Sequence, residues 1–220
     1  MRPSTEHLVI EGAAGRLQLA IDLPNAELVT LRGIAILCHP HPLFGGTMDN
    51  KIITTLARCM VSLGYASVRS NFRGVGESQG EHDHGAGEAE DTLTVLTWAQ
   101  QRFGKLPMVL CGFSFGAHVA TRVAAQLANA GTPAQRLVLV GTACGSVPGL
   151  RTYNTPDVPA DSIVIHGEVD ETVPLANVLD WARPQTLPVI VVPGADHFFH
   201  SKLQIIRDLV VRNWRDDTPH

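Results

Sequence analysis

From about residue 34 onward, short runs rich in β-branched residues alternate with segments in which apolar residues recur every three or four positions. Runs of the first kind are typical of buried strands, and segments of the second kind are typical of helices that bury one face. Their alternation is the pattern of βαβ units, in which helices cross over a mostly parallel sheet. The chain is therefore predicted to adopt an α/β fold.

About eight strands are expected. They cover residues 7–12, 16–24, 33–39, 65–72, 107–112, 136–142, 161–167 and 188–194. The first two are predicted to pair antiparallel across a turn that contains Gly12 and Gly15. Helices are predicted over residues 50–64, 87–103, 115–130 and 200–214. Asp49 or Asn50 can cap the first of these helices, and Gly64 can end it.

The chain of 220 residues is long enough to bury one core, and no repeat or linker divides it, so a single domain over residues 1–220 is expected. Charged residues make up 17% of the chain without a block of like charge, which argues against disorder and a nucleic-acid partner. No segment has the length and apolarity of a signal peptide or a membrane span. We expect a cytoplasmic protein, and the sequence does not indicate its oligomeric state.

The four cysteines are widely spaced and form no CxxC pair. They are Cys38, Cys59, Cys111 and Cys144. This spacing argues against a zinc ribbon or a redox motif and predicts buried free thiols.

Four predicted strands are followed by loops with polar residues that apolar packing does not require. These loops read "HPHPLFGGTMDN", "GFSFG", "HGEVDETVP" and "GADHFF". In such a sheet, ligand sites lie beyond the carboxyl ends of the strands. Ser114, Asp170 and His197 are therefore expected to meet in one cleft.

Together these three residue types can perform nucleophilic catalysis. A serine hydroxyl attacks only when a neighbouring group accepts its proton. His197 is the candidate base, because imidazole titrates near neutral pH and can return the proton to the leaving group. Asp170 would orient that ring and stabilise the imidazolium.

Each assignment has an alternative. Ser114 could instead cap a helix, and Asp170 could form a turn or cap a helix. His197 could be a buried structural histidine. Glu168 or Glu171 could be the acid, and His200 is a rival base that is expected to begin the last helix.

Gly112 and Gly116 flank Ser114 at two positions on either side. At a tight strand-to-helix corner the serine backbone is strained by about 1 to 3 kcal/mol, and side chains two residues away would clash. The glycines remove that clash. A phosphate-binding loop fits poorly, because no lysine follows in P-loop spacing and no GxGxxG motif is present here.

These features resemble the α/β-hydrolase superfamily. Its nucleophile elbow is GxSxG between a strand and a helix, followed in the chain by the acid and then the histidine. The stretches "SNFRGVGES", "HGEVDETVP" and "GADHFF" look like its loop after the fourth strand, its acid loop and its histidine loop. "CHPHPLFGGTMDNK" followed by "NFRGVGES" is similar to small lidless hydrolases near dienelactone hydrolases and serine peptidases.

The resemblance implies an α/β-hydrolase fold with about eight mostly parallel strands flanked by helices. The interval from Ser114 to Asp170 is filled by one strand, one helix and loops, so no substantial lid is expected. The site is then open and shallow. Its expected lining includes Leu43, Phe44 and Phe113, and Phe115, Phe198 and Phe199 are further candidates, although all six could equally belong to the core.

The resemblance also implies an oxyanion hole built from backbone N–H groups. Phe115, which follows the nucleophile, would provide the first donor. The second is expected from the loop after the third strand, at His41, because Pro40 and Pro42 have no N–H. Leu43 is the alternative donor.

Two pairs of histidines could ligate a metal ion, and they are His39, His41, His82 and His84. The prolines and the candidate triad already explain the first pair, and "EHDH" is interpreted as a solvated turn. Neither a metal nor an organic cofactor is expected.

Arg69 and Arg73 lie in "VRSNFRGVGES" and could bind an anionic substrate. We favour a structural role, in which they anchor this turn to Glu88 or Asp91 on the following helix.

The sequence therefore predicts a serine hydrolase that cleaves small ester or thioester substrates through an acyl-enzyme. Its partner would be a small-molecule acyl substrate. A peptidase or an acyltransferase with the same triad, and a non-catalytic binding protein on this fold, are the alternatives. The sequence does not identify the substrate, because loop shape determines it.

Overall fold

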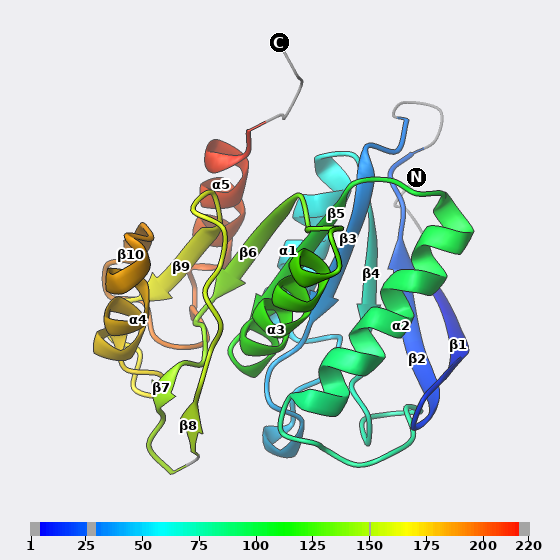
Figure 1. Cartoon of the computed structure of the whole chain (residues 1–220). Coiled ribbons are helices and arrows are strands. Elements are labelled where there is room, and N and C mark those ends of the chain that lie inside the picture. The colour runs from blue at the N-terminus through cyan, green and yellow to red at the C-terminus, as the bar shows by residue number, and fades with distance from the viewer. Residues whose placement is uncertain (1–4, 26–29, 150, 216–220) are drawn as a thin grey trace.

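The computed structural model describes residues 5–25, 30–149 and 151–215. At its centre lies an eight-stranded sheet in the order β1-β2-β4-β3-β5-β6-β9-β10 (Figure 1). The strands are β1 (Glu6–Gly12), β2 (Gly15–Asp22), β3 (Gly33–Cys38), β4 (Tyr65–Ser70), β5 (Met108–Phe113), β6 (Arg136–Val140), β9 (Ile163–Gly167) and β10 (Val189–Val192). The β2 strand pairs antiparallel with both β1 and β4, and the strands from β4 to β10 are parallel. This arrangement confirms the predicted α/β fold and its mostly parallel sheet.

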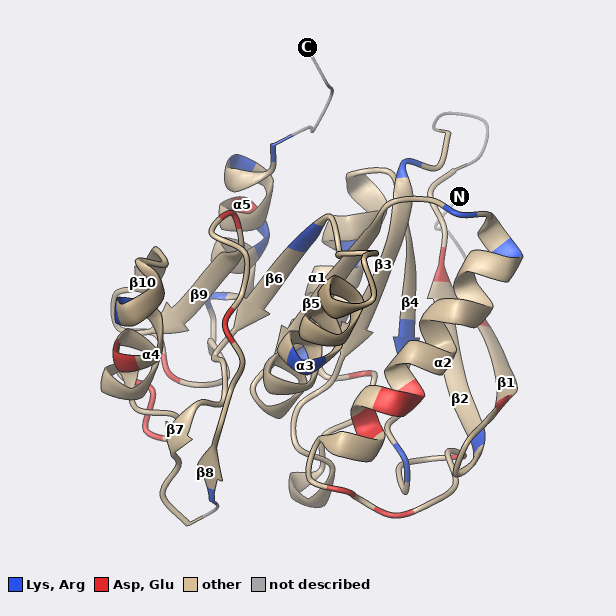
Figure 2. Cartoon of the chain, viewed as in Figure 1, with Lys and Arg blue, Asp and Glu red and all other residues tan. Residues whose placement is uncertain are grey.

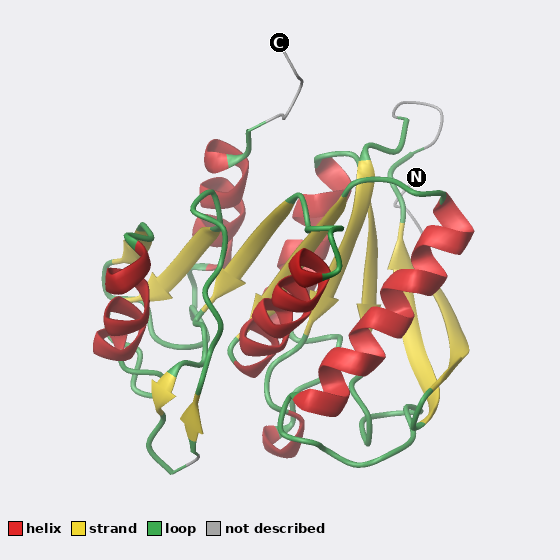
Figure 3. Ribbon diagram, in the orientation of Figure 1, coloured by secondary structure: helices red, strands yellow, loops and turns green. Residues whose placement is uncertain are grey.

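Helices cover both faces of the sheet (Figure 3). They are α1 (Lys51–Ser62), α2 (Ala86–Phe103), α3 (Phe115–Asn129), α4 (Leu175–Ala182) and α5 (Leu203–Asn213), with two 3₁₀ turns, η1 (Pro42–Phe44) and η2 (Arg183–Gln185). One apolar cluster joins α2, α3 and α4 to one face, and a second joins α1 and α5 to the other. The strands β3, β4, β5, β6 and β9 are accordingly buried at every residue, as expected for a sheet covered on both sides.

Two elements depart from the sequence expectation. Between β6 and β9 the chain forms a two-stranded ribbon of β7 (Gly145–Ser146) and β8 (Thr152–Tyr153) where only loop was expected. Strands of two residues are too short to show a hydrophobic period. The helix α4 was not expected either, since its N-cap residue, Pro174, offers no side-chain cap and the helix buries only Val178 and Ala182.

No helix in the described ranges is both long and apolar enough to serve as a bilayer-crossing segment.

All four cysteines are free and buried, as predicted. Burial raises the pKa of the Cys38 thiol to about 12, and that of Cys59 to about 11. The thiolate is the reactive form of cysteine, so these two side chains behave as small apolar groups at neutral pH.

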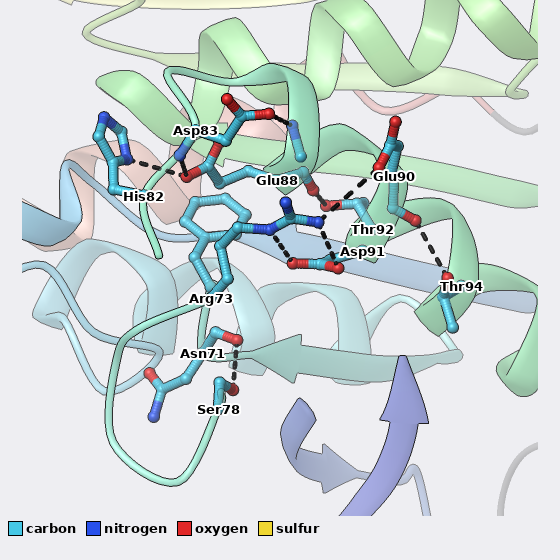
Figure 4. Close-up of polar contacts among 12 residues, drawn as sticks. Asn71, Arg73, Ser78, His82, Asp83, Glu88, Glu90, Asp91, Thr92 and Thr94 are labelled. Carbon is cyan, nitrogen blue, oxygen red and sulfur yellow. Dashed lines mark hydrogen bonds and ion pairs between the residues drawn. The ribbon is translucent and has the colours of Figure 1, made fainter. Parts of the chain in front are cut away.

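A buried ion pair ties the loop after β4 to α2, whose first turns are rich in acidic residues (Figure 2). Arg73 Nε and Nη2 donate to the two carboxylate oxygens of Asp91 at 2.7 and 2.9 Å (Figure 4). Hydrogen bonding to Asp91 raises the pKa of Arg73 further above its ordinary value. The expected anchoring of Arg73 to this helix is confirmed.

For Arg69 that expectation is wrong. It contacts Asp22 on β2 at 3.1 Å and Asp49 ahead of α1 at 2.8 Å. Arg69 also donates to the Met48 carbonyl, so its side chain points toward the α1 side of the sheet, away from α2. The α1 cap is Asn50, which accepts from Ile52 N–H, and this leaves Asp49 available to Arg69.

Replacing Asp91 with asparagine is expected to lower the free energy of unfolding by about 3 kcal/mol, because the Arg73 guanidinium loses its buried counter-charge and keeps only the exposed Glu90 carboxylate at 3.9 Å. Urea denaturation at neutral pH measures the change. Asp49→Asn is the matched control: the Asp49 side chain is 66% exposed, and its loss should change the free energy of unfolding by less than about 1 kcal/mol. Equal losses in the two variants would contradict the assigned role of the Arg73–Asp91 pair.

Candidate active site

Ser114 occupies the corner between β5 and α3 with φ 56° and ψ −120°. This left-handed φ is unfavourable for a residue with a β-carbon and is held against a strain of about 1 to 3 kcal/mol. Its N–H donates to Val140 O at 2.9 Å, and its carbonyl accepts from Ala117 and Ala143 N–H. Bonds to both neighbouring segments therefore fix the strained corner.

The flanking glycines allow three backbone segments to meet here. A β-carbon on Gly116 would overlap with the carbonyl oxygens of Cys38 and His39 in the loop after β3. A β-carbon on Gly112 would overlap with the first turn of α3 at Gly116 and Ala117. The glycines thus serve close backbone packing, as the sequence argument expected.

The structure brings Ser114, His197 and Asp170 into one hydrogen-bonded chain. His197 Nε2 lies 2.9 Å from Ser114 Oγ, and His197 Nδ1 lies 2.7 Å from Asp170 Oδ2. Asp170 Oδ1 accepts from the N–H groups of Thr172 and Val173 at 2.9 and 2.7 Å. With Nδ1–H directed at the carboxylate, Nε2 presents its lone pair to the serine hydroxyl.

A second histidine supports the acid, although sequence reasoning gave it no role. His166 is fully buried on β9, with Nε2 3.0 Å from Val173 O and 3.4 Å from Asp170 Oδ2. Burial lowers the pKa of His166, which favours its neutral form. The available signal was a polar residue that ends an apolar run four positions before Asp170.

The rival residues lie elsewhere. Glu168 accepts from Gly194 N–H at 2.8 Å, and Glu171 is exposed beside the cleft. His200 pairs with Asp196 at the surface, and α5 begins only at residue 203.

A cleft of about 510 Å³ opens beside Ser114 and His197. The remaining lining residues are Pro40, His41, Phe44, Gly45, Gly46, Asn50, Pro148, Gly149, Glu171, Thr172 and Phe198. Phe44 and Phe198 are exposed large apolar side chains at this cleft, as expected for a wall that contacts substrate.

Two of the expected lining residues need correction. Phe113 is fully buried at the end of β5 and packs under the His197 ring, with the ring centroids 4.9 Å apart. It supports the imidazole instead of lining the cleft. Leu43 is 69% exposed but does not line the cleft. Phe115 and Phe199 also belong to the core.

The candidate oxyanion donors lie on either side of Ser114. Phe115 is the first residue of α3, so its N–H has no acceptor within the helix. His41 precedes η1, and its ring Nδ1 accepts from Leu43 N–H at 3.3 Å. Because the His41 ring already engages Leu43 N–H, Leu43 is the weaker of the two candidates for the second donor.

His39 fixes the start of this loop. Its Nε2 accepts from Phe72 N–H at 2.9 Å, and its Nδ1 donates to Pro40 O at 2.7 Å. Burial lowers the pKa of His39 to about 4, so the ring is neutral at pH 7 and can accept one of these bonds and donate the other.

The "EHDH" segment is exposed at Glu81, Asp83 and His84, as expected for a solvated turn, but His82 departs from that expectation. The His82 side chain is only 6% exposed and packs among rings near the cleft. Among the described residues, no three His, Cys, Asp or Glu side chains are arranged to hold a metal ion.

A family model described as serine aminopeptidase, S33, matches residues 32–188, which is most of the chain. The chain belongs to this family of α/β hydrolases. A serine hydrolase structure from Xanthomonas campestris, described as lacking a lid, superposes with a TM-score of 0.86 at 37% identity, over 98% of this chain and 97% of that one. The α/β-hydrolase resemblance and the lidless fold inferred from the sequence are thereby confirmed.

Two curated relatives add further context. An uncharacterized protein of Rickettsia prowazekii is 31% identical over 189 residues, which cover 82% of this hydrolase and 75% of that protein. The lysophosphatidylserine lipase ABHD12 of Danio rerio is 34% identical over 105 residues, which cover 46% of this hydrolase and 27% of the lipase.

In this hydrolase, Gly116→Ala is expected to lower kcat/KM by about 100-fold or more, because the added methyl group separates α3 from the loop after β3 and a displaced oxyanion donor costs that much. Initial rates with an activated ester measure the effect. Ala120→Gly, one turn further along α3, is the control; it should change kcat/KM by less than about threefold. A Gly116→Ala protein as active as the wild type would contradict the close-packing argument.

The depressed pKa of His39 predicts a pH effect on stability. The unfolded chain takes up a proton near pH 6.5, whereas folded His39 does so only near pH 4. The contribution of neutral His39 to the free energy of unfolding is therefore fully present above pH 6.5. It decreases as the pH falls toward 4, by about 1.4 kcal/mol per pH unit. The variant His39→Gln can still accept from Phe72 N–H but does not titrate. In urea denaturation between pH 4 and 6.5, it should reduce the slope of the unfolding free energy against pH by up to the amount that one proton contributes. Identical slopes would contradict the assignment.

Proposed function

We propose that this hydrolase cleaves small ester or thioester substrates through an acyl-enzyme. In this proposal Ser114 is the nucleophile, His197 is the general base and then the general acid, and Asp170 orients the imidazole. The observation that carries the proposal is the unbroken chain of contacts from Asp170 through His197 to Ser114 Oγ, at 2.7 and 2.9 Å.

In the first half-reaction, Ser114 Oγ attacks the substrate carbonyl carbon while its proton moves to His197 Nε2. The carbonyl oxygen acquires negative charge, which the backbone N–H groups of Phe115 and His41 would stabilise. His197 then protonates the leaving alkoxide or thiolate as the tetrahedral intermediate collapses. The products are the free alcohol or thiol and the acyl-serine.

In the second half-reaction, water replaces the leaving group. His197 takes a proton from the water as its oxygen attacks the acyl carbon, and then returns a proton to Ser114 Oγ. The carboxylic acid departs, and the enzyme is restored. Asp170 stays ionised throughout and stabilises the imidazolium that forms in each half-reaction.

The cleft supports a small acyl substrate. Its volume of about 510 Å³ lies within the range that small-molecule sites occupy. Phe44 and Phe198 offer apolar surface within this cleft. The name of the relative ABHD12, a lysophosphatidylserine lipase, supports ester bonds, whereas the description of the family, serine aminopeptidase, keeps amide bonds as the alternative.

Covalent labelling with a fluorophosphonate probe tests the nucleophile. Wild-type protein should label at neutral pH, and Ser114→Ala should not, because the probe reacts with an activated serine hydroxyl. Ser62→Ala is the matched control, since the Ser62 hydroxyl only donates to Cys59 O within α1. Labelling of Ser114→Ala at the wild-type level would show that the nucleophile is another residue.

Turnover of p-nitrophenyl esters, acyl-CoA thioesters and aminoacyl amides tests the bond type. Ester or thioester turnover should exceed amide turnover, and the reverse order would favour a peptidase. Ser114→Ala is expected to reduce kcat by about 10⁶-fold and Asp170→Asn by about 10⁴-fold. Unchanged activity in Asp170→Asn would move the acid to another carboxylate.

A further inference from the structure

His82 forms a wedge, meaning here a ring that packs against both residues whose N–H groups are the candidate oxyanion donors. Its ring centroid lies 4.7 Å from that of His41 and 5.2 Å from that of Phe115. The His41 and Phe115 rings are themselves 4.9 Å apart, so the three rings form one closed cluster. These rings come from the loop after β3, from the start of α3 and from the loop that precedes α2.

Glu88 anchors this wedge from α2. The carboxylate is fully buried and accepts from the N–H groups of Gly85 at 2.7 Å and Asp83 at 2.9 Å. Its Oε1 also lies 2.8 Å from His82 Nδ1, and Figure 4 shows the imidazole turned toward the carboxylate. A buried carboxylate is stable only where such partners satisfy it, and the two backbone N–H groups do so for Glu88. Glu88 therefore fixes the loop backbone and lies in direct contact with the His82 ring, although this contact does not have hydrogen-bond geometry.

The same loop is held from the opposite side. Arg151 Nη2 donates to the His84 carbonyl at 2.8 Å, and its guanidinium lies over the Tyr153 ring of β8 at 4.7 Å. The His84 ring contacts the His82 ring, with centroids 4.9 Å apart. The loop is thereby fastened to α2 on one side and to the β7–β8 ribbon on the other.

The His41 ring that contacts His82 is uncharged at neutral pH. Burial, together with the neighbouring His82 and Arg151, lowers the pKa of His41 to about 4. At neutral pH the His41 ring is therefore neutral, and its Nδ1 accepts from Leu43 N–H. This bond couples the position of the His41 ring to the backbone of the loop after β3.

We propose that His82 is a positioning residue for the oxyanion hole: its ring, held by Glu88, sets the spacing between the backbone N–H groups of His41 and Phe115. The inference rests on the proposed function, because it requires that an oxyanion form between these two donors. His82 touches neither the nucleophile nor the cleft. It acts through His41 and Phe115, the two residues that its ring packs against.

Misplaced donors weaken the transition state more than substrate binding, because the full negative charge exists only in the tetrahedral state. Complete loss of one donor lowers kcat by about 100- to 1000-fold in the mutational precedent. Removal of the His82 ring leaves both N–H donors present, but the distance between them is no longer fixed. We therefore expect a decrease of about 10- to 100-fold in kcat with KM changed by less than about twofold.

The test compares His82→Ala with His82→Phe in p-nitrophenyl ester hydrolysis by the full chain. His82→Phe keeps a planar ring between His41 and Phe115, so it should recover kcat to within about threefold of the wild type. His84→Ala is the matched control. It removes a histidine ring that contacts His82 from the same loop, and it should leave kcat within about twofold of the wild type.

Near-ultraviolet circular dichroism and thermal unfolding establish that each variant is folded. If His82→Ala does not fold, His82→Leu replaces it, since leucine fills the space without a planar ring and the same loss of kcat is expected. A folded variant without the ring that retains wild-type kcat overturns the proposal. So does an equal loss in His84→Ala, or a loss that appears in KM alone.

Failure of the proposed function is distinguishable from failure of this inference. If wild-type protein hydrolyses none of the substrates and does not label with fluorophosphonate, the proposed function is wrong. If wild-type protein is active and Ser114→Ala is inactive, but removal of the His82 ring has no effect, only the positioning role is wrong.

Discussion

The close approach of α3 to the backbone after β3 is the constraint on which the rest of this structure depends. The strand order places β3 beside β5, and Gly116 lets the first turn of α3 rest on the Cys38 and His39 carbonyls. That contact brings Ser114 and Phe115 from one segment next to His41 from another. It also closes the corner tightly enough that Ser114 keeps its left-handed φ. A side chain at residue 116 would push apart every group that the chemistry requires to be near.

Two buried carboxylates in this hydrolase are satisfied in the same way. Each accepts two backbone N–H groups from its own loop and faces one imidazole. The partners are Thr172 N, Val173 N and His197 for Asp170, and Asp83 N, Gly85 N and His82 for Glu88. The backbone donors stabilise each anion. His197 Nδ1 is hydrogen-bonded to Asp170, whereas His82 Nδ1 contacts Glu88 at 2.8 Å without hydrogen-bond geometry. One arrangement lies beside the proposed base, and the other lies beside a ring that contacts the candidate oxyanion donors.

Much of this could be read from the sequence, and the reason is periodicity. Buried parallel strands appear as continuous apolar runs, so the sheet and its carboxyl-end loops were predictable, as was the meeting of Ser114, Asp170 and His197. The direction in which an individual side chain points could not be predicted in this way. Phe113 and Phe44 are both aromatic residues near the loops, yet one packs under His197 and the other faces the cleft. His82 looked solvated because its neighbours are polar, and only the buried Glu88 on α2 reveals why it turns inward.

Between β6 and β9, the part of the chain that the structure describes builds no regular structure beyond the β7–β8 ribbon. The entrance to the cleft is thus open without any rearrangement of the backbone. In enzymes whose active sites close, opening of the covering segment often limits turnover on the microsecond to millisecond scale. In the proposed reaction, a substrate would reach Ser114 without waiting for any helix or strand among the described residues of this segment to move away.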